Sequence, residues 1–303
     1  MKILLSIIGT TGIGKTKLAI DLARHFGCEI VSCDSRQFFK EIPIGTAAPD
    51  ETELSQAKHH FIGNLSVKDY YSIGQYEVDA LNLLERLFKK NDVAILVGGS
   101  MMYEKAVIEG LNDLPETNTE NQQRLNAILE EEGLEGLHSI LKELDWAYFE
   151  KVDKGNPRRF LRAIDVIWQT GKTYTELINQ PKKERDFKVI RIGLKADRAI
   201  IYDRINRRVE KMMEKGLLNE VKSMVEYKDL VPLKTVGYTE LFNYLEGKWD
   251  LDFAISEIQK NSRRFAKRQL TWYRKENNIH WVDFENSLKE TLSLLEEKYN
   301  IKQ

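Results

Sequence analysis

Hydrophobic and polar positions repeat with two different periods along the chain, and these periods predict its secondary structure. Short apolar runs, typical of strands buried on both faces of a parallel sheet, lie at residues 2–8, 29–33, 93–97 and 188–194. Between them apolar residues recur at helical spacing, as with Leu18, Leu22 and Phe26 before Gly27. Strands that alternate with helices in this way indicate an α/β fold built on a doubly wound parallel sheet.

The middle of the chain follows a different pattern. Between residues 113 and 186 the strand signals disappear, and helical periodicity combined with high charge takes their place. We therefore expect a core formed by residues 1–112 and 187–303, and a helical insertion domain formed by residues 113–186. After the strand at 188–194, we expect helices to near the end of the chain.

A glycine-rich loop follows the first predicted strand and precedes the first predicted helix. It matches the pattern G-x-x-x-x-G-K-[ST] and consists of Gly9, Thr10, Thr11, Gly12, Ile13, Gly14, Lys15 and Thr16. In this context backbone N–H groups surround a phosphate, Lys15 adds a positive charge, and the Thr16 hydroxyl suits Mg²⁺. The pattern predicts a P-loop NTPase-like core that binds a nucleotide such as ATP or another phosphate compound, without specifying which.

An acidic residue in this core stands where a ligand crevice is expected. A P-loop nucleotidase carries an Asp at the end of a strand to help hold Mg²⁺, but the predicted strand at 93–97 ends in Gly98-Gly99-Ser100. Asp34 instead ends the strand at 29–33, at the carboxyl edge of the sheet. Its carboxylate could bind metal, accept a proton from a nucleophile, or only cap a helix.

Two further polar features near the predicted sheet allow both a structural and a functional interpretation. Ser100 could cap the helix that follows it, or offer its hydroxyl to the crevice. The pair His59-His60 could polarise a substrate, but an isolated pair is more often structural, and we assign it no role.

Basic residues form three stripes on predicted amphipathic helices. On helical projections these stripes consist of Arg158, Arg159 and Arg162; of Arg204, Arg208, Lys211 and Lys215; and of Arg263, Arg264, Lys267, Arg268 and Arg274. One such stripe is usually a solvated face, whereas three beside a phosphate loop favour a nucleic-acid partner. Trp272 and Tyr273 could stack on unpaired bases, although aromatic residues at helical spacing usually belong to a core.

The overall composition excludes some classes of protein but not a polyanion-binding enzyme. The formal net charge is −1, yet Lys and Arg are locally concentrated, so a nucleic-acid partner stays possible. Cys28 and Cys33 form no Cys-x-x-Cys pair and lack neighbouring histidines at zinc-ligand spacing. The apolar run at 3–8 is too short to cross a bilayer. We expect a cytoplasmic, globular enzyme without a membrane segment.

These motifs, in this order, resemble the tRNA dimethylallyltransferase (isopentenyltransferase) family along nearly the whole chain. The matching stretches are residues 9–16, 34–37, 44–47, 59–60, 96–103, 158–163, 212–217, 236–238 and 266–272. The resemblance implies a P-loop core, a helical insertion that embraces the anticodon stem-loop of tRNA, and a channel that admits the two substrates from opposite ends. It implies transfer of a dimethylallyl group from dimethylallyl diphosphate to N6 of the adenosine at position 37, beside the anticodon.

The resemblance also implies roles for individual residues. Asp34 would be the general base, Lys15 and Arg208 would balance the charge of the diphosphate, and Ser100 would contact the reacting region. Mg²⁺ is the implied cofactor, with Thr16 as its ligand, and the enzyme is expected to be a monomer. The implied tRNA contacts are Asp34, Ser35, Arg36, Gln37, Arg158, Arg159, Phe160, Leu161, Arg162, Lys234, Thr235, Val236, Gly237, Tyr238, Thr239, Lys267, Arg268, Gln269, Leu270, Thr271, Trp272, Tyr273 and Arg274.

The sequence departs from the family pattern at a few positions. Ser100 replaces a more usual threonine but keeps the hydroxyl, and Arg36 stands where methionine is common. Ala48 replaces a frequent lysine, and Gln122 falls near a position where arginine often touches tRNA, so contacts there are in doubt. The zinc-finger tail of eukaryotic members is missing, which favours the bacterial type.

Two other classes of function fit parts of the pattern. A small-molecule P-loop kinase, or a prenyltransferase acting on free adenine nucleotides, would work without RNA and leaves the basic stripes unexplained. A nucleotide-gated RNA-binding module would bind ATP and modify no base.

Overall fold

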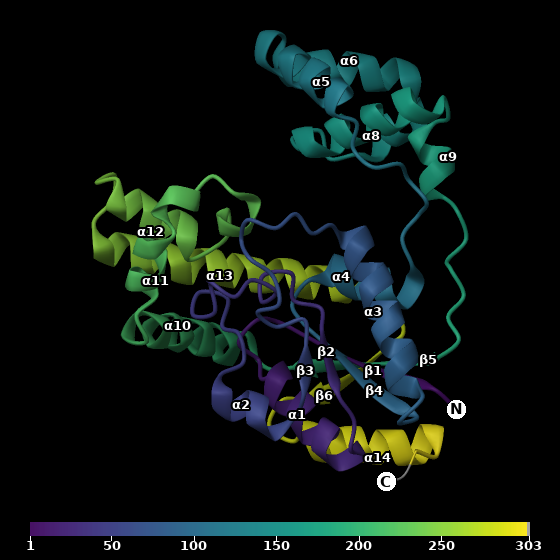
Figure 1. Cartoon of the computed structure of the whole chain (residues 1–303), viewed down its shortest axis with the longest axis vertical. Coiled ribbons are helices and arrows are strands. Elements are labelled where there is room, and N and C mark those ends of the chain that lie inside the picture. Colours follow the sequence, from purple (N-terminus) through teal and green to yellow (C-terminus); the bar gives the residue numbers. More distant parts are fainter. Residues whose placement is uncertain (302–303) are drawn as a thin grey trace. The chain divides into compact units, whose positions relative to one another are not determined.

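The computed structural model describes residues 1–301 and divides into two compact units (Figure 1). Residues 1–109 and 185–303 form the first unit, which we call the core, and residues 110–184 form the second, the insertion. The insertion therefore begins where one helix of the core ends, at Glu109, and it ends just before a strand that begins at Lys188. Each unit has its own hydrophobic cluster and is described by itself below.

A six-stranded sheet, parallel throughout, organises the core. Its strands are β1 (Ile3–Ile8), β2 (Ile30–Ser32), β3 (His59–His60), β4 (Val93–Val97), β5 (Lys188–Lys195) and β6 (Ile279–Asp283). Their spatial order is β3-β2-β4-β1-β5-β6, so β1 lies between β4 and β5 in the middle of the sheet. Four of these strands match predicted runs. Both edge strands were missed, and the expectation that only helices follow β5 is wrong, because β6 pairs with it.

Helices cover both faces of this sheet, as a doubly wound fold requires. The helices of the core are α1 (Lys15–Phe26), α2 (Glu51–Gln56), α3 (Ile73–Phe88), α4 (Met101–Glu109), α10 (Arg198–Glu214), α11 (Leu217–Ser223), α12 (Tyr238–Leu245), α13 (Leu251–Tyr273) and α14 (Ser287–Tyr299). Successive residues of β1 point to opposite faces: Leu4 packs in one cluster with α3, and Leu5 in another with α1 and α14. This explains why β1 is apolar throughout.

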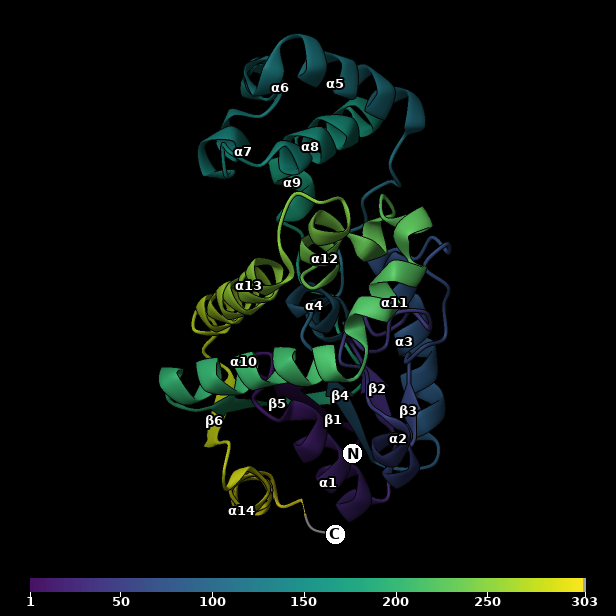
Figure 2. The same cartoon turned by 90° about the vertical axis from the view of Figure 1, so that its left-hand side faces the viewer.

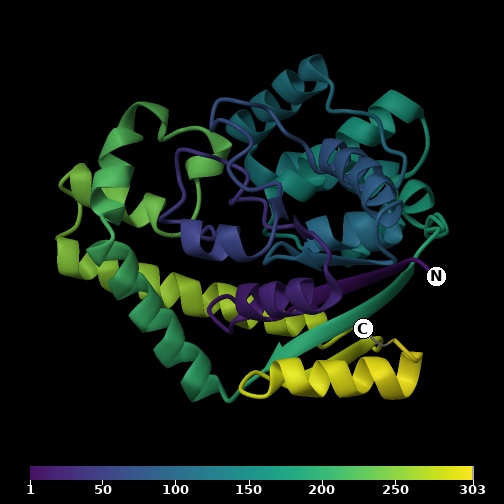
Figure 3. The ribbon, with the colours of Figure 1, turned by 60° about the horizontal axis from the view of Figure 1, so that its bottom comes forward.

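Two long helices lie near the carboxyl ends of the strands. α10 begins three residues after β5 ends, and it packs beside α13 (Figures 2 and 3). Arg263 on α13 donates a hydrogen bond of 2.6 Å to the side-chain oxygen of Asn206 on α10. The two basic stripes predicted for the core therefore belong to neighbouring helices.

A buried ion pair fixes α4 to the sheet. Glu104 accepts hydrogen bonds from the hydroxyl of Ser6 on β1 at 2.7 Å and from Arg191 on β5 at 3.0 and 3.1 Å. Arg191 also donates to the side chain of Asn278 at 2.9 Å, so its charge is well surrounded by acceptors. Because Glu104 lies one turn after Ser100, this network holds the start of α4 at the carboxyl edge of the sheet.

The insertion is a small helical unit with its own core. It contains α5 (Thr119–Glu131), α6 (Gly133–Leu144), α7 (Trp146–Lys151), α8 (Pro157–Thr170) and α9 (Tyr174–Ile178). Leu125, Leu137, Leu141, Phe160 and Ile164 are fully buried and pack together. The apolar faces seen in the sequence therefore bury against one another within the insertion, which explains its helical periodicity.

The histidine pair and the two cysteines singled out in the sequence lie in the core, and His59 also lines the cavity described below. His60 on the edge strand β3 forms a 2.6 Å contact with the carboxylate of Glu29, and the ring of His59 bonds to the carbonyl of Ala57. Cys28 and Cys33 are buried free thiols. Within residues 1–301, no helix has the length and apolar character needed to cross a bilayer.

Candidate functional site

The glycine-rich loop presents an uncapped helix N-terminus to a cavity. α1 begins at Lys15, and its N-cap residue Gly14 has φ of 112° and carries no side chain that could cap the helix. Gly9 and Gly12 also have positive φ, a conformation that other residues adopt only with strain. The first N–H groups of α1 lack partners within the helix and carry the positive end of its dipole. The loop is therefore suited to bind an anion, as the sequence predicted.

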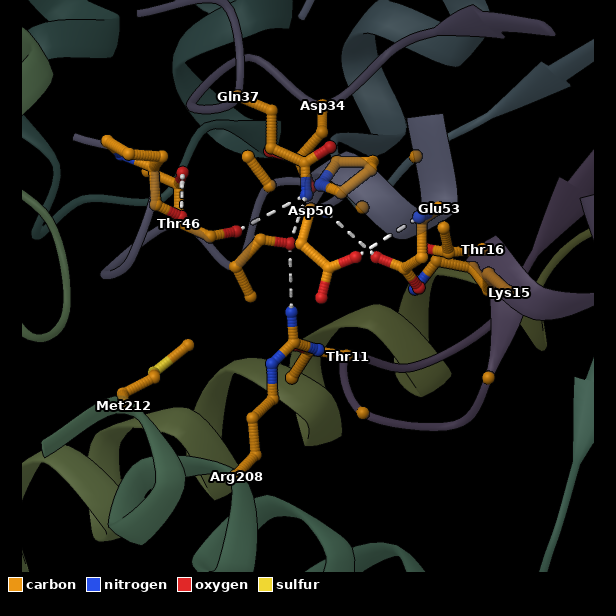
Figure 4. A pocket seen from close by; sticks show the side chains of 18 of the residues that line it. Thr11, Lys15, Thr16, Asp34, Gln37, Thr46, Asp50, Glu53, Arg208 and Met212 are labelled. Atoms are coloured by element: carbon orange, nitrogen blue, oxygen red, sulfur yellow. Dashed lines mark hydrogen bonds between the residues drawn. The ribbon is translucent and has the colours of Figure 1, made fainter. Parts of the chain in front are cut away.

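Two cationic side chains, Lys15 and Arg208, line the cavity at this helix end (Figure 4). The ammonium of Lys15 folds over its own loop and donates to the carbonyl oxygens of Gly9 at 3.2 Å and Thr10 at 2.9 Å. Arg208 reaches in from α10 and lies 3.5 Å from the Thr11 hydroxyl. Burial lowers the pKa of Lys15 to about 8 and lowers that of Arg208, while the carboxylate of Asp34 acts in the opposite direction on both. For both cations, the effect of burial on the pKa thus outweighs that of Asp34.

Asp34 lies at the end of β2 and lines the same cavity as Lys15 and Arg208. One carboxylate oxygen accepts a hydrogen bond of 3.2 Å from the backbone N–H of Arg36, which stabilises a turn. No helix begins after Asp34, because the next one, α2, starts at Glu51, so the helix-cap alternative is wrong. The carboxylate stabilises a turn and also lines the cavity. The structure brings a potential proton acceptor to the anion-binding loop.

The close approach of two strand ends places Asp34 there. A Cβ atom on Gly98, at the end of β4, would lie 2.5 Å from the carbonyl carbon of Cys33 and 2.7 Å from the backbone nitrogen of Asp34. Both distances are too short for real atoms, so a glycine is needed at this position. A Cβ on Gly99 would lie 3.0 Å from the Asp34 carboxylate. The Gly-Gly pair therefore serves close packing around Asp34.

Ser100 supports the turn that carries Asp34. Its hydroxyl accepts a hydrogen bond of 3.0 Å from the N–H of Ser35 and lies 2.8 Å from the Ser35 hydroxyl. Among the described residues, Gly98 and Gly99 line the cavity but Ser100 does not. The structure therefore shows Ser100 joining the start of α4 to the Asp34 turn, and its contact with a substrate stays a prediction.

The cavity has a volume of about 910 Å³ and a second wall that the sequence did not reveal. This wall is the segment 43–50, in which the backbone N–H groups of Ile44 and Gly45 each donate to the carboxylate of Glu220 at 2.8 Å. Tyr238 donates its hydroxyl hydrogen to the same carboxylate, and a Cβ on Gly45 would lie 2.5 Å from the Tyr238 ring. Only residues 44–47 and Ala48 were noted beforehand, through the family resemblance, because the partners of this segment lie far away in sequence.

The basic stripe of α10 forms a third wall. Arg204, Arg208, Lys211 and Lys215 all line the cavity, and Arg204 donates a hydrogen bond of 2.8 Å to the carbonyl of Gly12. The structure therefore places this stripe on the cavity, and binding of diphosphate by these cations stays a prediction.

The donors around the cavity fit Mg²⁺ held mainly by a bound phosphate compound. Thr16 lines the cavity together with the carboxylates of Asp34, Asp50 and Glu53. Within residues 1–301, no group of three or more His, Cys, Asp or Glu side chains could hold a metal alone. Mg²⁺ usually needs only one or two protein oxygens when phosphate oxygens and waters complete its shell, so this donor set suits it.

The residues expected to contact tRNA range from exposed to fully buried. Exposed side chains are Arg158, Arg159, Lys234, Thr239, Lys267, Arg268, Thr271 and Arg274. On α13, a groove of about 430 Å³ is lined by Arg264, Lys267, Arg268, Thr271, Trp272 and Lys275. Phe160, Tyr238 and Gln269 are 0% exposed and Tyr273 is 1% exposed, so these four side chains pack in the interior and are not available to RNA in this structure.

Other expected contacts are engaged within the protein. Arg162 donates a hydrogen bond of 2.6 Å to the carbonyl of Pro115 and pairs with Asp165 inside the insertion. Gln37 donates its amide hydrogens to the carbonyls of Thr46 and Ala47, which anchors the wall 43–50. These side chains shape their surroundings whatever else they contact.

The depressed pKa of Lys15 predicts a pH effect on anion binding. Above pH 8 the free protein holds Lys15 largely uncharged, so binding of inorganic pyrophosphate then requires uptake of a proton. We expect the wild-type affinity, relative to that of Lys15→Arg, to fall by up to about tenfold per pH unit above about 8. The arginine stays charged over this pH range. The ionisation of pyrophosphate itself affects both proteins equally, so it cancels in the comparison. Titration calorimetry between pH 7 and 9 measures both proteins, and parallel curves would contradict the prediction.

Comparison with known proteins agrees with this geometry along almost the entire chain. A family model described as IPP transferase matches residues 37–276. Relatives named tRNA dimethylallyltransferase, from Christiangramia forsetii, and tRNA dimethylallyltransferase 1, from Bacteroides fragilis, are 51% and 46% identical. The alignments cover 98% and 97% of this chain and 98% of each relative.

Two solved structures share the fold. The full-length tRNA isopentenylpyrophosphate transferase from Bacillus halodurans superposes with a TM-score of 0.70 at 32% identity, covering 96% of this chain and 94% of that one. A eukaryotic dimethylallyltransferase captured acting on tRNA gives a TM-score of 0.82 at 25% identity, covering 99% and 77%. The P-loop NTPase-like fold is thereby confirmed, and the chain belongs to the IPP transferase family, whose bacterial members it matches over nearly their full length.

Proposed function

We propose that this chain is a tRNA dimethylallyltransferase, which transfers a dimethylallyl group from dimethylallyl diphosphate to N6 of the adenosine at position 37 of tRNA. One observation carries the proposal: a single cavity contains an uncapped helix N-terminus, several Lys and Arg side chains that include Lys15 and Arg208, and the carboxylate of Asp34. The helix end and the cations suit a departing diphosphate, and the carboxylate suits a nucleophile that must lose a proton. The names of the relatives support this substrate pair.

The leaving group is stabilised by charge that is already in place. As the allylic carbon–oxygen bond breaks, its electron pair passes to the diphosphate, whose negative charge increases. Lys15, Arg208 and the N–H groups at the start of α1 face that charge. Because they bind the departing diphosphate more strongly than the intact substrate, they lower the barrier. Thr16 would hold Mg²⁺, which would supply further charge neutralisation when bound.

The nucleophile needs a base because its lone pair is delocalised into the adenine ring. N6 forms the new bond to the allylic carbon, and Asp34 accepts the proton that N6 releases. Gln37 lines the same cavity, and its side-chain oxygen can accept a hydrogen bond from the base. The adenosine must leave its stack to reach Asp34, which costs less in a loop than in a duplex.

The exposed cations provide surfaces for the tRNA backbone. In the core, the groove of α13 combines Lys267 and Arg268 with the ring of Trp272, which suits phosphates beside an unpaired base. In the insertion, Arg158 and Arg159 stay exposed on α8. The anticodon stem-loop is the proposed partner of both surfaces. A cytoplasmic location and a monomeric state stay predictions.

The function is tested by following labelled dimethylallyl diphosphate. The protein is incubated with Mg²⁺ and either unmodified tRNA or AMP, and the label is located by chromatography of nuclease digests. We expect label on N6 of adenosine 37 of tRNA and none on AMP. Label on AMP would indicate a prenyltransferase of free nucleotides, and ATP binding without transfer would indicate an RNA-binding module.

Asp34→Asn tests the role of the base. Asparagine keeps the shape and the acceptor for the Arg36 N–H but cannot take the proton, so we expect turnover to fall about 10²- to 10⁴-fold. Binding of tRNA should change little, and pyrophosphate should bind at least as tightly, because a negative charge has been removed. Rapid-quench kinetics and titration calorimetry measure these quantities. Normal turnover of bound substrates would refute the assignment.

Lys267→Ala combined with Arg268→Ala tests the groove on α13. Each lost phosphate contact should reduce the slope of log affinity against log salt by roughly 0.7 to 0.9, so the double variant should lose about 1.5. Lys89→Ala combined with Lys90→Ala is a matched control, because these lysines precede β4 at the opposite, amino edge of the sheet. Filter binding at salt concentrations from about 50 to about 300 mM, where this effect is large, gives the slopes. Equal slopes for the two variants would exclude the groove.

A further inference from the structure

One buried side chain connects the two loops that carry the proposed chemistry. Gln269 on α13 accepts a hydrogen bond of 2.8 Å from the backbone N–H of Thr11 in the phosphate loop. Through its amide nitrogen it donates a second bond of 2.8 Å to the carbonyl of Gly99. These loops follow β1 and β4, the neighbouring central strands of the sheet. Gln269 therefore bridges them from outside the sheet.

The surroundings of Gln269 leave little freedom for this bridge. The side chain is fully buried, and breaking either bond would leave a buried polar group without its partner. A Cβ on Gly99 would lie 3.2 Å from the Gln269 amide nitrogen and 3.0 Å from the Asp34 carboxylate. The backbone of Gly99 thus lies against both side chains. A shift of Gln269 is passed to Gly99, and through it to Asp34.

The bridge also determines which amides of the phosphate loop can face an anion. The N–H of Thr11 points to Gln269, so anion binding falls to the N–H groups nearer the start of α1. Without the Gln269 oxygen, the Thr11 N–H would lose its partner, and the loop that holds the anion would lose its fixed position. The position of the bound diphosphate therefore depends on a residue that is itself fully buried behind the cavity wall.

We propose that Gln269 is a positioning residue that fixes the diphosphate loop and the proton acceptor Asp34 at the separation the transfer requires. The proposal rests on the proposed function and assigns Gln269 a role other than the tRNA contact expected from its helix. In a displacement the nucleophile and the leaving group lie on opposite sides of one carbon. An error of about 1 Å in their separation can cost about 100-fold in rate.

Gln269→Glu provides the test, because a carboxyl group can reproduce the bridge only when it is protonated. The charged form accepts from Thr11 but cannot donate to Gly99, and its charge opposes the diphosphate. Burial raises the pKa of such a carboxyl group, so protonation falls within a usable range. We expect the rate of Gln269→Glu relative to wild type to increase about tenfold as the pH falls from about 8 to about 6.

Gln269→Leu is the control, since it fills similar space and forms neither bond at any pH. Its rate should be about 10- to 100-fold below wild type, with a ratio that does not vary with pH. For both variants the tRNA dissociation constant should stay within about twofold of wild type, which separates positioning from RNA contact. A pH-independent ratio for Gln269→Glu, or weakened tRNA binding with normal turnover of bound substrates, would overturn the proposal.

A second measurement keeps this test separate from the proposed function. The affinity for inorganic pyrophosphate, followed by calorimetry on the same proteins, should fall in Gln269→Leu and recover in Gln269→Glu at low pH. If wild-type protein transfers no dimethylallyl group but pyrophosphate shows this pattern, the proposed function fails and the bridge stands. If transfer occurs and pyrophosphate affinity is the same in all three proteins at every pH, the proposed function stands and only the positioning role of Gln269 is refuted.

Discussion

Positive charge concentrated at the N-terminus of α1 is the constraint on which the rest of the structure depends. Lys15 and Arg208 are half-buried there, and the helix dipole adds to their field. Such an arrangement is costly in the free protein, as the lowered pKa of Lys15 shows. The cost is recovered when an anion binds. Asp34 offsets part of the field, which lets a carboxylate stay beside a site for diphosphate.

The parallel sheet explains how these groups meet. The carboxyl ends of β1, β2 and β4 lie at one edge, so the loops that follow them share one crevice. Gly98 lets the ends of β2 and β4 touch, and the hydrogen bonds of Ser100 and Gln269 then tie neighbouring loops together. Glu104 anchors the same region from beneath through Ser6 and Arg191. Rigid elements therefore surround the site, and its geometry is set before any substrate arrives.

Local signals in the sequence predicted much of this arrangement, and contacts between distant residues account for what they missed. The phosphate loop and Asp34 were found because a strand, a glycine pattern and a helix lie next to one another in the chain. β6 was missed because it is a short edge strand of partly exposed residues. The wall 43–50 is held by Glu220, about 175 residues away in the sequence, which accepts hydrogen bonds from the backbone N–H groups of Ile44 and Gly45. The spacing of hydrophobic and polar residues along the chain does not indicate contacts between such distant residues.

Helix α13 shows why a projection of charge onto a helix is informative and still incomplete. Lys267 and Arg268 are exposed as the projection indicates, but Gln269, the next residue, turns into the interior and reaches two catalytic loops. A helix with cations on one face and a bridging amide on the other contacts both the proposed RNA surface and the diphosphate site. An enzyme that prenylates free nucleotides would need only the inner face. In the proposed function, the outer groove is therefore the feature that would distinguish a tRNA substrate from a mononucleotide.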